Sequence, residues 1–309
     1  MSELTLLVVA DPAAPYLTPL AQINQKARMI VTNDRSEVLR VAPEADVLLN
    51  GDFRNGELFQ EAFRQGKRLR WVHSPAAGVE KVLSPEIAAS KVPLTNGRGV
   101  FARPLGEWIV GAMLFFTYDM RKNLDDQRAH AWKPAEHGEL YGQTLAIIGY
   151  GSIGHAAEER ARAFGMKILT IRRGENAKLR EVLSQCDFAA VCAPLTRETR
   201  GMIGAAEIAA MKKTAVIINV GRGPVIDEKS LIAALKEKKI RGAALDVFET
   251  EPLPANSPFF ELENVLISPH SADFLPDLRE RALQFFVENF DRFVKGEPLQ
   301  NVVDKHAGY

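Results

Sequence analysis

Three residues in the second half of the chain combine a cation, a carboxylate and a proton donor: Arg222, Glu251 and His270. The planar guanidinium of Arg222 suits a carboxylate. The imidazole of His270 can give a proton to a carbonyl oxygen and take it back. Glu251 is expected to pair with the imidazole, hold its tautomer and keep it protonated. Apart from a hydride donor, these groups meet the needs of 2-keto acid reduction.

Each of these residues also has a purely structural interpretation. An arginine between two glycines, as Arg222 is, often only completes a turn, and an isolated histidine is often a capping or core residue. Glu251 can likewise be an exposed loop glutamate with no partner role. Other chemistries have less support. The pair His130 and His137 lies in a polar stretch with Pro134 between them, so no metal site is expected. No serine stands in a G-x-S-x-G elbow.

A glycine-rich segment is the candidate site for the hydride-carrying cofactor. It follows an apolar run at 145–148 and opens a helical stretch at 152–164, which is the context of a dinucleotide-binding loop. Its glycines would allow a tight turn, a close approach of the pyrophosphate and helix packing, while the helix N-terminus faces the phosphates. The predicted cofactor-binding residues of this loop are Gly149, Tyr150, Gly151, Ser152, Ile153 and Gly154.

The position that usually decides between NAD and NADP carries two arginines, Arg172 and Arg173. An NAD-preferring site usually has an acidic residue about 20 residues after the loop, at the end of the second strand. The stretch 170–173 contains no carboxylate. Arg172 is expected to meet the 2′-phosphate, and Arg173 to stack on adenine or add a contact. NADP(H) is therefore the predicted preferred cofactor, and NAD(H) stays possible if both arginines are merely solvated.

Alternating short apolar runs and helical stretches predict an α/β protein with parallel sheets and crossover helices. The early strands are expected at 4–9, 29–31, 47–50 and 69–73, with a helix at 58–65. A second series of strands is expected at 144–148, 167–171, 188–192, 215–220, 243–247 and 265–268. One amphipathic helix over 100–122 would link two domains, and another over 276–293 would end the chain.

The composition is that of an ordinary globular protein with two domains. Its 309 residues exceed the size of a usual single core. Lys plus Arg and Asp plus Glu both total 39, so no nucleic acid or acidic membrane partner is expected. The apolar run at 4–10 is too short for a membrane span. Two cysteines, Cys186 and Cys192, give no disulfide framework and favour a cytoplasmic location.

Four blocks of the sequence resemble the D-isomer-specific 2-hydroxyacid dehydrogenase family, and the likeness continues more loosely at 76–79 and 106–107. The blocks are GQTL at 142–145, running into the glycine loop; PLT at 194–196 with Thr199; NVGRG at 219–223 with Asp227; and ALDVFE at 244–249, followed by EPLP at 251–254 and SPH at 268–270. The resemblance is strongest to its NADP-preferring, glyoxylate/hydroxypyruvate reductase-like members.

The resemblance implies two parallel-sheet α/β domains. A Rossmann nucleotide domain of residues 99–273 would be inserted in a flavodoxin-like substrate domain of residues 1–98 and 274–309. Backbone N–H groups of Ala77 and Gly78 would receive the substrate carboxylate, and only domain closure would bring them to Arg222. The family resemblance also implies a homodimer. The further cofactor-binding residues would be Ala193, Pro194, Thr199, Val220 and, beside the nicotinamide carboxamide, Asp246.

Two alternatives stay open within this resemblance. A dinucleotide-sensing corepressor-like protein could share the fold and keep all three catalytic residues. A formate dehydrogenase would need a smaller pocket and additional segments, which the sequence does not show. Cofactor-dependent turnover of a keto acid distinguishes the enzyme from the binding protein.

Overall fold

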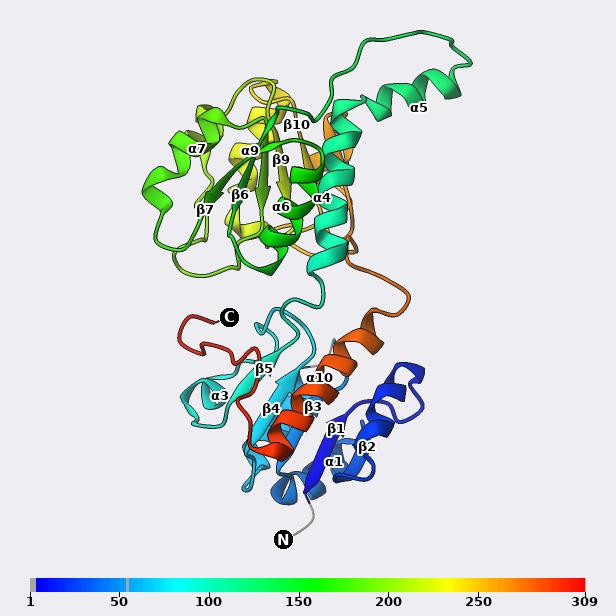
Figure 1. Ribbon diagram of the computed structural model, residues 1–309, viewed down its shortest axis with the longest axis vertical. Helices are drawn as coiled ribbons and strands as arrows, with labels where there is room; N and C mark the ends of the chain where they lie inside the picture. Colours follow the sequence, from blue (N-terminus) through cyan, green and yellow to red (C-terminus); the bar gives the residue numbers. More distant parts are fainter. Residues whose placement is uncertain (1–3, 54–55, 309) are drawn as a thin grey trace. The chain divides into compact units, whose positions relative to one another are not determined.

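The protein forms two compact units, residues 1–101 with 275–309 and residues 102–274. A computed structural model describes residues 4–53 and 56–308 (Figure 1). The predicted domain boundaries fall at 98/99 and 273/274, within three residues of the edges of these units. The functional roles assigned to the two domains stay a prediction.

The first unit is built on a five-stranded sheet in which all neighbouring strands are parallel. Its strand order is β2-β1-β3-β4-β5, the flavodoxin-like order. Every residue of β1 is buried, as expected of a strand covered on both faces. The strands are β1 (Thr5–Val9), β2 (Arg28–Thr32), β3 (Val47–Asn50), β4 (Trp71–Ser74) and β5 (Leu94–Asn96).

Helices cover both faces of this sheet. One face packs on α1 (Arg35–Val41), α2 (Glu57–Gln65) and α3 (Pro85–Ala89). The other packs on the 3-10 segment η1 (Pro15–Ile23) and on the terminal helix α10 (Leu278–Lys295), which contact each other. The buried Trp71 ring stacks on Phe286 of α10 at 5.0 Å. Helix α10, far along the chain from the strands of this sheet, therefore completes the core of the first unit.

The second unit contains a six-stranded parallel sheet, ordered β11-β10-β9-β8-β6-β7. The chain runs outward from β6 to β7 on one side and returns to β8 on the other. This reversal is the switch point at which open α/β sheets bind ligands beyond the carboxyl ends of their strands. The strands are β6 (Thr144–Ile148), β7 (Lys167–Ile171), β8 (Phe188–Val191), β9 (Val216–Asn219), β10 (Gly242–Leu245) and β11 (Val265–Ile267).

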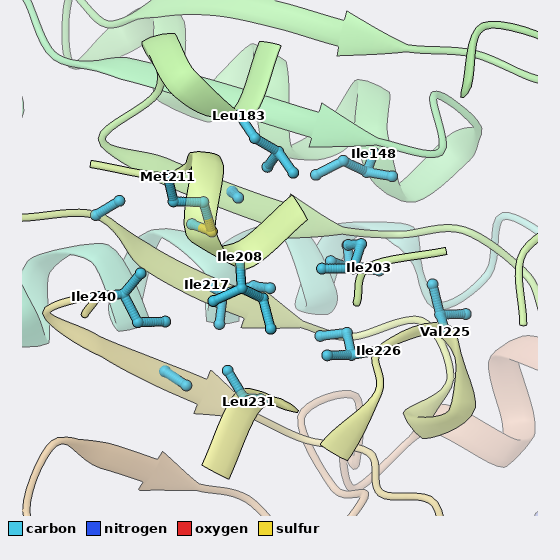
Figure 2. Packing of buried hydrophobic residues seen from close by; sticks show 14 of the residues in the cluster. Ile148, Leu183, Ile203, Ile208, Met211, Ile217, Val225, Ile226, Leu231 and Ile240 are labelled. Carbon is cyan, nitrogen blue, oxygen red and sulfur yellow. The ribbon is translucent and has the colours of Figure 1, made fainter. Parts of the chain in front are cut away.

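Both faces of the second sheet are also covered by helices. On one face α4 (Ala102–Thr117) packs against α6 (Ser152–Ala163), as Figure 1 shows. The other face packs on α7 (Leu179–Gln185), α8 (Ala205–Ala210) and α9 (Glu228–Lys236). Figure 2 shows this core, in which Ile217 of β9 lies among Leu183, Ile208 and Leu231 of the three helices.

The structure confirms the predicted fold class of two parallel-sheet α/β domains and corrects two local predictions. The single helix expected over 100–122 is wrong: α4 ends at Thr117, and α5 (Met120–Arg128) begins after Asp119, whose φ is +47°. The apolar spacing continued through this break, but Met120 and Leu124 are exposed. The strand β5 was missed because three residues carry too little periodic pattern.

The described residues also bear on the expectations drawn from composition. No helix among residues 4–53 and 56–308 is long and apolar enough to cross a membrane. Burial raises the pKa of both thiols, Cys186 and Cys192, to about 12. In the same ranges, no group of three or more His, Cys, Asp or Glu side chains is placed to hold a metal ion.

The fully buried His73 of β4 makes the stability of the first unit depend on pH. Burial lowers the pKa of His73 from 6.5 to about 3. The unfolded chain therefore binds the proton more readily, and stability is lost as pH falls below 6.5. We expect the unfolding free energy to drop by about 2 kcal/mol between pH 7 and pH 5 on account of this residue.

Urea unfolding followed by circular dichroism at the two pH values measures this effect. In His73→Asn the drop should shrink, whatever the change in absolute stability. Replacing the exposed His306 by Asn is the matched control and should leave the drop as it is. An equal drop in wild type and His73→Asn would show that other groups govern the acid sensitivity.

Candidate functional site

The glycine loop has the backbone geometry that a bound pyrophosphate needs. Gly149 has a φ of +92°, and a Cβ there would lie 2.5 Å from the backbone nitrogen of Ala193. A Cβ on Gly154 would lie 2.9 Å from Cγ2 of Ile147 on β6. A Cβ on Gly151 would meet no atom of the described residues within 4 Å. The loop thus packs closely on the protein at Gly149 and Gly154 and leaves space at Gly151, as the fit of a dinucleotide requires.

The remaining loop residues continue into the next helix. Ser152 and Ile153 form the first turn of α6, whose N-terminus therefore faces the switch point beside β6. A helix of 12 residues presents free N–H groups and a positive dipole end there. The neighbouring loop after β8 is held by Thr199, whose hydroxyl donates to the carbonyl of Pro194 at 2.6 Å.

The two arginines expected at the adenosine end follow β7 directly, and both are exposed. The Arg172 guanidinium lies over the ring of Tyr150, 4.5 Å from its centroid. The backbone N–H of Arg172 donates to the Glu175 carboxylate at 2.9 Å, and this bond is the largest cause of the lowered pKa of Glu175. Two cations therefore stand at the carboxyl end of β7, where a 2′-phosphate would lie.

Arg222 follows β9 in a loop fixed by backbone packing. A Cβ on Gly221 would lie 2.5 Å from the carbonyl oxygen of Ala193, and one on Gly223 would lie 1.9 Å from the carbonyl carbon of Phe248. Val220 before them is buried. The side-chain amide of Asn219 holds this loop through two hydrogen bonds. Its oxygen accepts the backbone N–H of Gly221 at 3.1 Å, and its nitrogen donates to the Arg222 carbonyl at 3.2 Å.

His270 and Glu251 form a direct pair. Nδ1 of His270 lies 2.7 Å from Oε2 of Glu251. The second oxygen of Glu251 accepts the backbone N–H of Phe248 at 2.9 Å, so the carboxylate is anchored to its own turn. Because Nδ1 is bonded to Glu251, Nε2 is the ring nitrogen that can face a substrate.

Asp246 organises the loop that carries the histidine. It is 2% exposed, and its Oδ1 accepts the N–H groups of Ser271 at 2.9 Å and Ala272 at 3.0 Å. The backbone N–H of His270 also donates to the Asp246 carbonyl at 2.9 Å. Asp246 therefore has a clear structural role, and its expected contact with the nicotinamide carboxamide stays a prediction.

Asp273 is a residue of this site that the sequence interpretation missed. Its Oδ1 is buried and has no hydrogen-bond partner among residues 4–53 and 56–308. Burial raises the pKa of Asp273 most, followed by the charge of Asp246, while His270 and Arg222 lower it. These interactions place all four groups in one cluster. The available signal was a carboxylate three residues after His270, but it lies outside the family blocks.

The predicted carboxylate-binding residues lie in the first unit, in the turn after β4. The side-chain amide of Asn96 donates to the Ala77 carbonyl at 2.6 Å, and the N–H of Gly97 donates to the Ala76 carbonyl at 3.0 Å. Ala77 and Gly78 are partly exposed. The second unit thus brings Arg222, Glu251 and His270 together, while Ala77 and Gly78 belong to the other unit.

Comparison with known proteins gives a consistent result. The model of the "D-isomer specific 2-hydroxyacid dehydrogenase, NAD binding domain" family matches residues 110–272. A glyoxylate reductase of Korarchaeum cryptofilum is 36% identical over 264 residues, covering 80% of each chain.

Two solved structures match nearly the whole chain. A family protein from Aeromonas salmonicida has a TM-score of 0.84 and 30% identity, covering 98% of this chain and 100% of its own. The NADPH-dependent glyoxylate/hydroxypyruvate reductase of Sinorhizobium meliloti, solved with NADP and sulfate, has a TM-score of 0.83 and 27% identity, covering 99% and 100%. The chain therefore belongs to the D-isomer-specific 2-hydroxyacid dehydrogenase family.

Proposed function

We propose that this oxidoreductase uses NADPH to reduce a small 2-keto acid to the D-2-hydroxy acid, with His270 as the proton donor. The observation that carries the proposal is the 2.7 Å pair between His270 Nδ1 and Glu251 Oε2, in a cluster with Arg222. Glyoxylate and hydroxypyruvate are the first candidate substrates, because similar proteins carry these names.

Three side chains divide the work around the keto acid. The planar fork of Arg222 binds the carboxylate and polarises the carbonyl. His270 delivers its proton from Nε2 to the carbonyl oxygen and takes it back in the reverse direction. Glu251 holds the imidazole in this orientation through its contact with Nδ1. Bound NADPH supplies the hydride.

Arg172 and Arg173 support NADP(H) as the preferred cofactor, with NAD(H) possible. Their guanidinium groups suit a 2′-phosphate, and no carboxylate stands among residues 170–173 to bind both ribose hydroxyls. The S. meliloti reductase was solved with NADP.

The backbone N–H groups of Ala77 and Gly78 are proposed to receive the substrate carboxylate. The same proposal assigns Ala193, Pro194, Thr199, Val220 and Asp246 to the cofactor site.

We also propose a homodimer, as the family resemblance implies. The segment from Tyr118 to Trp132 supports an interface, since it exposes Met120 and Leu124 as well as these two aromatic residues. None of the nine residues of α5, all of them described, is buried. Apolar side chains grouped on a surface mark interaction sites. The expected cytoplasmic location stays a prediction.

The purified chain is expected to oxidise NADPH with glyoxylate or hydroxypyruvate, and His270→Ala should lower kcat about a hundred- to ten-thousand-fold. The Kd for NADPH should stay near its original value, because His270 acts on the substrate. Steady-state assays and cofactor titration measure both. His306→Ala is the matched control. Cofactor binding without turnover of any keto acid would instead support the corepressor-like alternative.

Arg222→Lys should raise KM for the keto acid and lower kcat, because a point charge does not replace a planar fork. The loss of a charged hydrogen bond predicts that kcat/KM falls about 10- to 100-fold. Arg180→Lys, on an exposed arginine of α7, is the charge-matched control. An unchanged kcat/KM in Arg222→Lys would rule out direct substrate contact.

The preference for NADPH over NADH should fall about tenfold or more when Arg172 or Arg173 becomes Ala. The ratio of the two kcat/KM values measures it. Arg40→Ala removes an exposed arginine of α1, outside the cofactor site, and should leave the ratio intact. A ratio that survives both substitutions would show that these arginines are only solvated.

A further inference from the structure

The glycine loop contains an aromatic residue that contacts the cofactor-selecting arginine. The Arg172 guanidinium lies 4.5 Å from the centroid of the Tyr150 ring. An exposed arginine side chain has many rotamers and loses this freedom when it binds a ligand. Stacking on a ring limits the freedom in advance and leaves the guanidinium edges available for hydrogen bonds.

Tyr150 is itself held in place by α6. Its hydroxyl donates to Oε2 of Glu158, and its ring contacts the imidazole of His155 at a centroid distance of 4.2 Å. Glu158 is largely buried and pairs with Nη2 of Arg162 at 2.6 Å. The ring under Arg172 is therefore fixed by a chain of contacts that begins on the helix.

The backbone of Arg172 is fixed as well. Its N–H donates to the Glu175 carboxylate at 2.9 Å, and its carbonyl accepts the N–H of Glu175 at 3.0 Å. Glu175 in turn pairs with Lys178 at 3.0 Å. Arg172 is thus held at both ends, by its own turn at the backbone and by Tyr150 at the guanidinium.

We propose that Tyr150 is a positioning residue that holds the Arg172 guanidinium ready for the 2′-phosphate and so strengthens the preference for NADP(H). The proposal rests on the proposed function, in which Arg172 binds that phosphate. Pre-organisation removes part of the ordering cost of binding. Because it acts through Arg172, it favours ligands that carry the 2′-phosphate and leaves those without it unaffected.

Isothermal titration of the full chain with 2′,5′-ADP and with 5′-AMP tests the proposal without catalysis. Tyr150→Leu should weaken 2′,5′-ADP about 2- to 10-fold and leave 5′-AMP unchanged. Tyr150→Phe keeps the ring but loses the bond to Glu158, so its effect should be smaller. In an Arg172→Ala background, Tyr150→Leu should cause no further loss, because the two residues act as one unit.

Three results would overturn the proposal. Equal weakening of both ligands by Tyr150→Leu would mean that Tyr150 shapes the adenosine site in general. Unchanged 2′,5′-ADP binding would mean that Arg172 needs no support, and a full additional loss in the Arg172→Ala background would mean that the residues act separately. If the leucine variant folds poorly, Tyr150→Met, which also removes the ring but keeps a long apolar side chain, gives the same readouts.

Failure of this proposal differs from failure of the proposed function. If Arg172→Ala lowers the preference for 2′,5′-ADP but Tyr150→Leu does not, only the positioning role is lost. If neither Arg172→Ala nor Arg173→Ala changes the preference, the assignment of the arginines to the 2′-phosphate falls first, and the role of Tyr150 falls with it.

Discussion

The site depends on backbone segments that approach one another too closely for a side chain. A Cβ on Gly149 or Gly221 would lie 2.5 Å from backbone atoms of Ala193, and one on Gly223 would lie 1.9 Å from the Phe248 backbone. Interiors this closely packed leave little room for adjustment. The contact at Gly223 joins the Arg222 loop to the turn that ends in Glu251, so the backbone segments that carry the cation and the carboxylate are held against each other.

The buried carboxylate of Asp246 fixes the backbone that carries His270, as the glycines fix the loop that carries Arg222. Asp246 accepts two N–H groups of the loop after His270, while its own carbonyl accepts the N–H of His270. A buried carboxylate without such partners would be costly, so the loop and the carboxylate stabilise each other. The imidazole therefore reaches Glu251 from a backbone that is already fixed.

The sequence predicts most of the sheet and the chemistry, because both leave local patterns. Apolar runs located β3, β6 and β7 to the residue, and the family blocks named the His270–Glu251 pair that the structure brings together. What it missed depends on tertiary context. The break at Asp119 needs a left-handed residue that apolar spacing does not reveal, and Asp273 stands out only through its burial beside Arg222 and His270.

The sheet order separates the proposed cofactor-selecting residue from the proposed catalytic residues. Arg172 follows the edge strand β7, whereas Arg222 and His270 follow β9 and β11. At about 4.8 Å per strand, β7 lies roughly 14 Å from β9 and roughly 24 Å from β11. A ligand that engages both ends must be long, as a dinucleotide is, and substitutions this far apart act nearly independently. The glycine loop follows β6, between these two ends, where the proposed site would bind the pyrophosphate shared by all such cofactors. The choice of cofactor and the reaction would then be determined by residues on opposite sides of the loop.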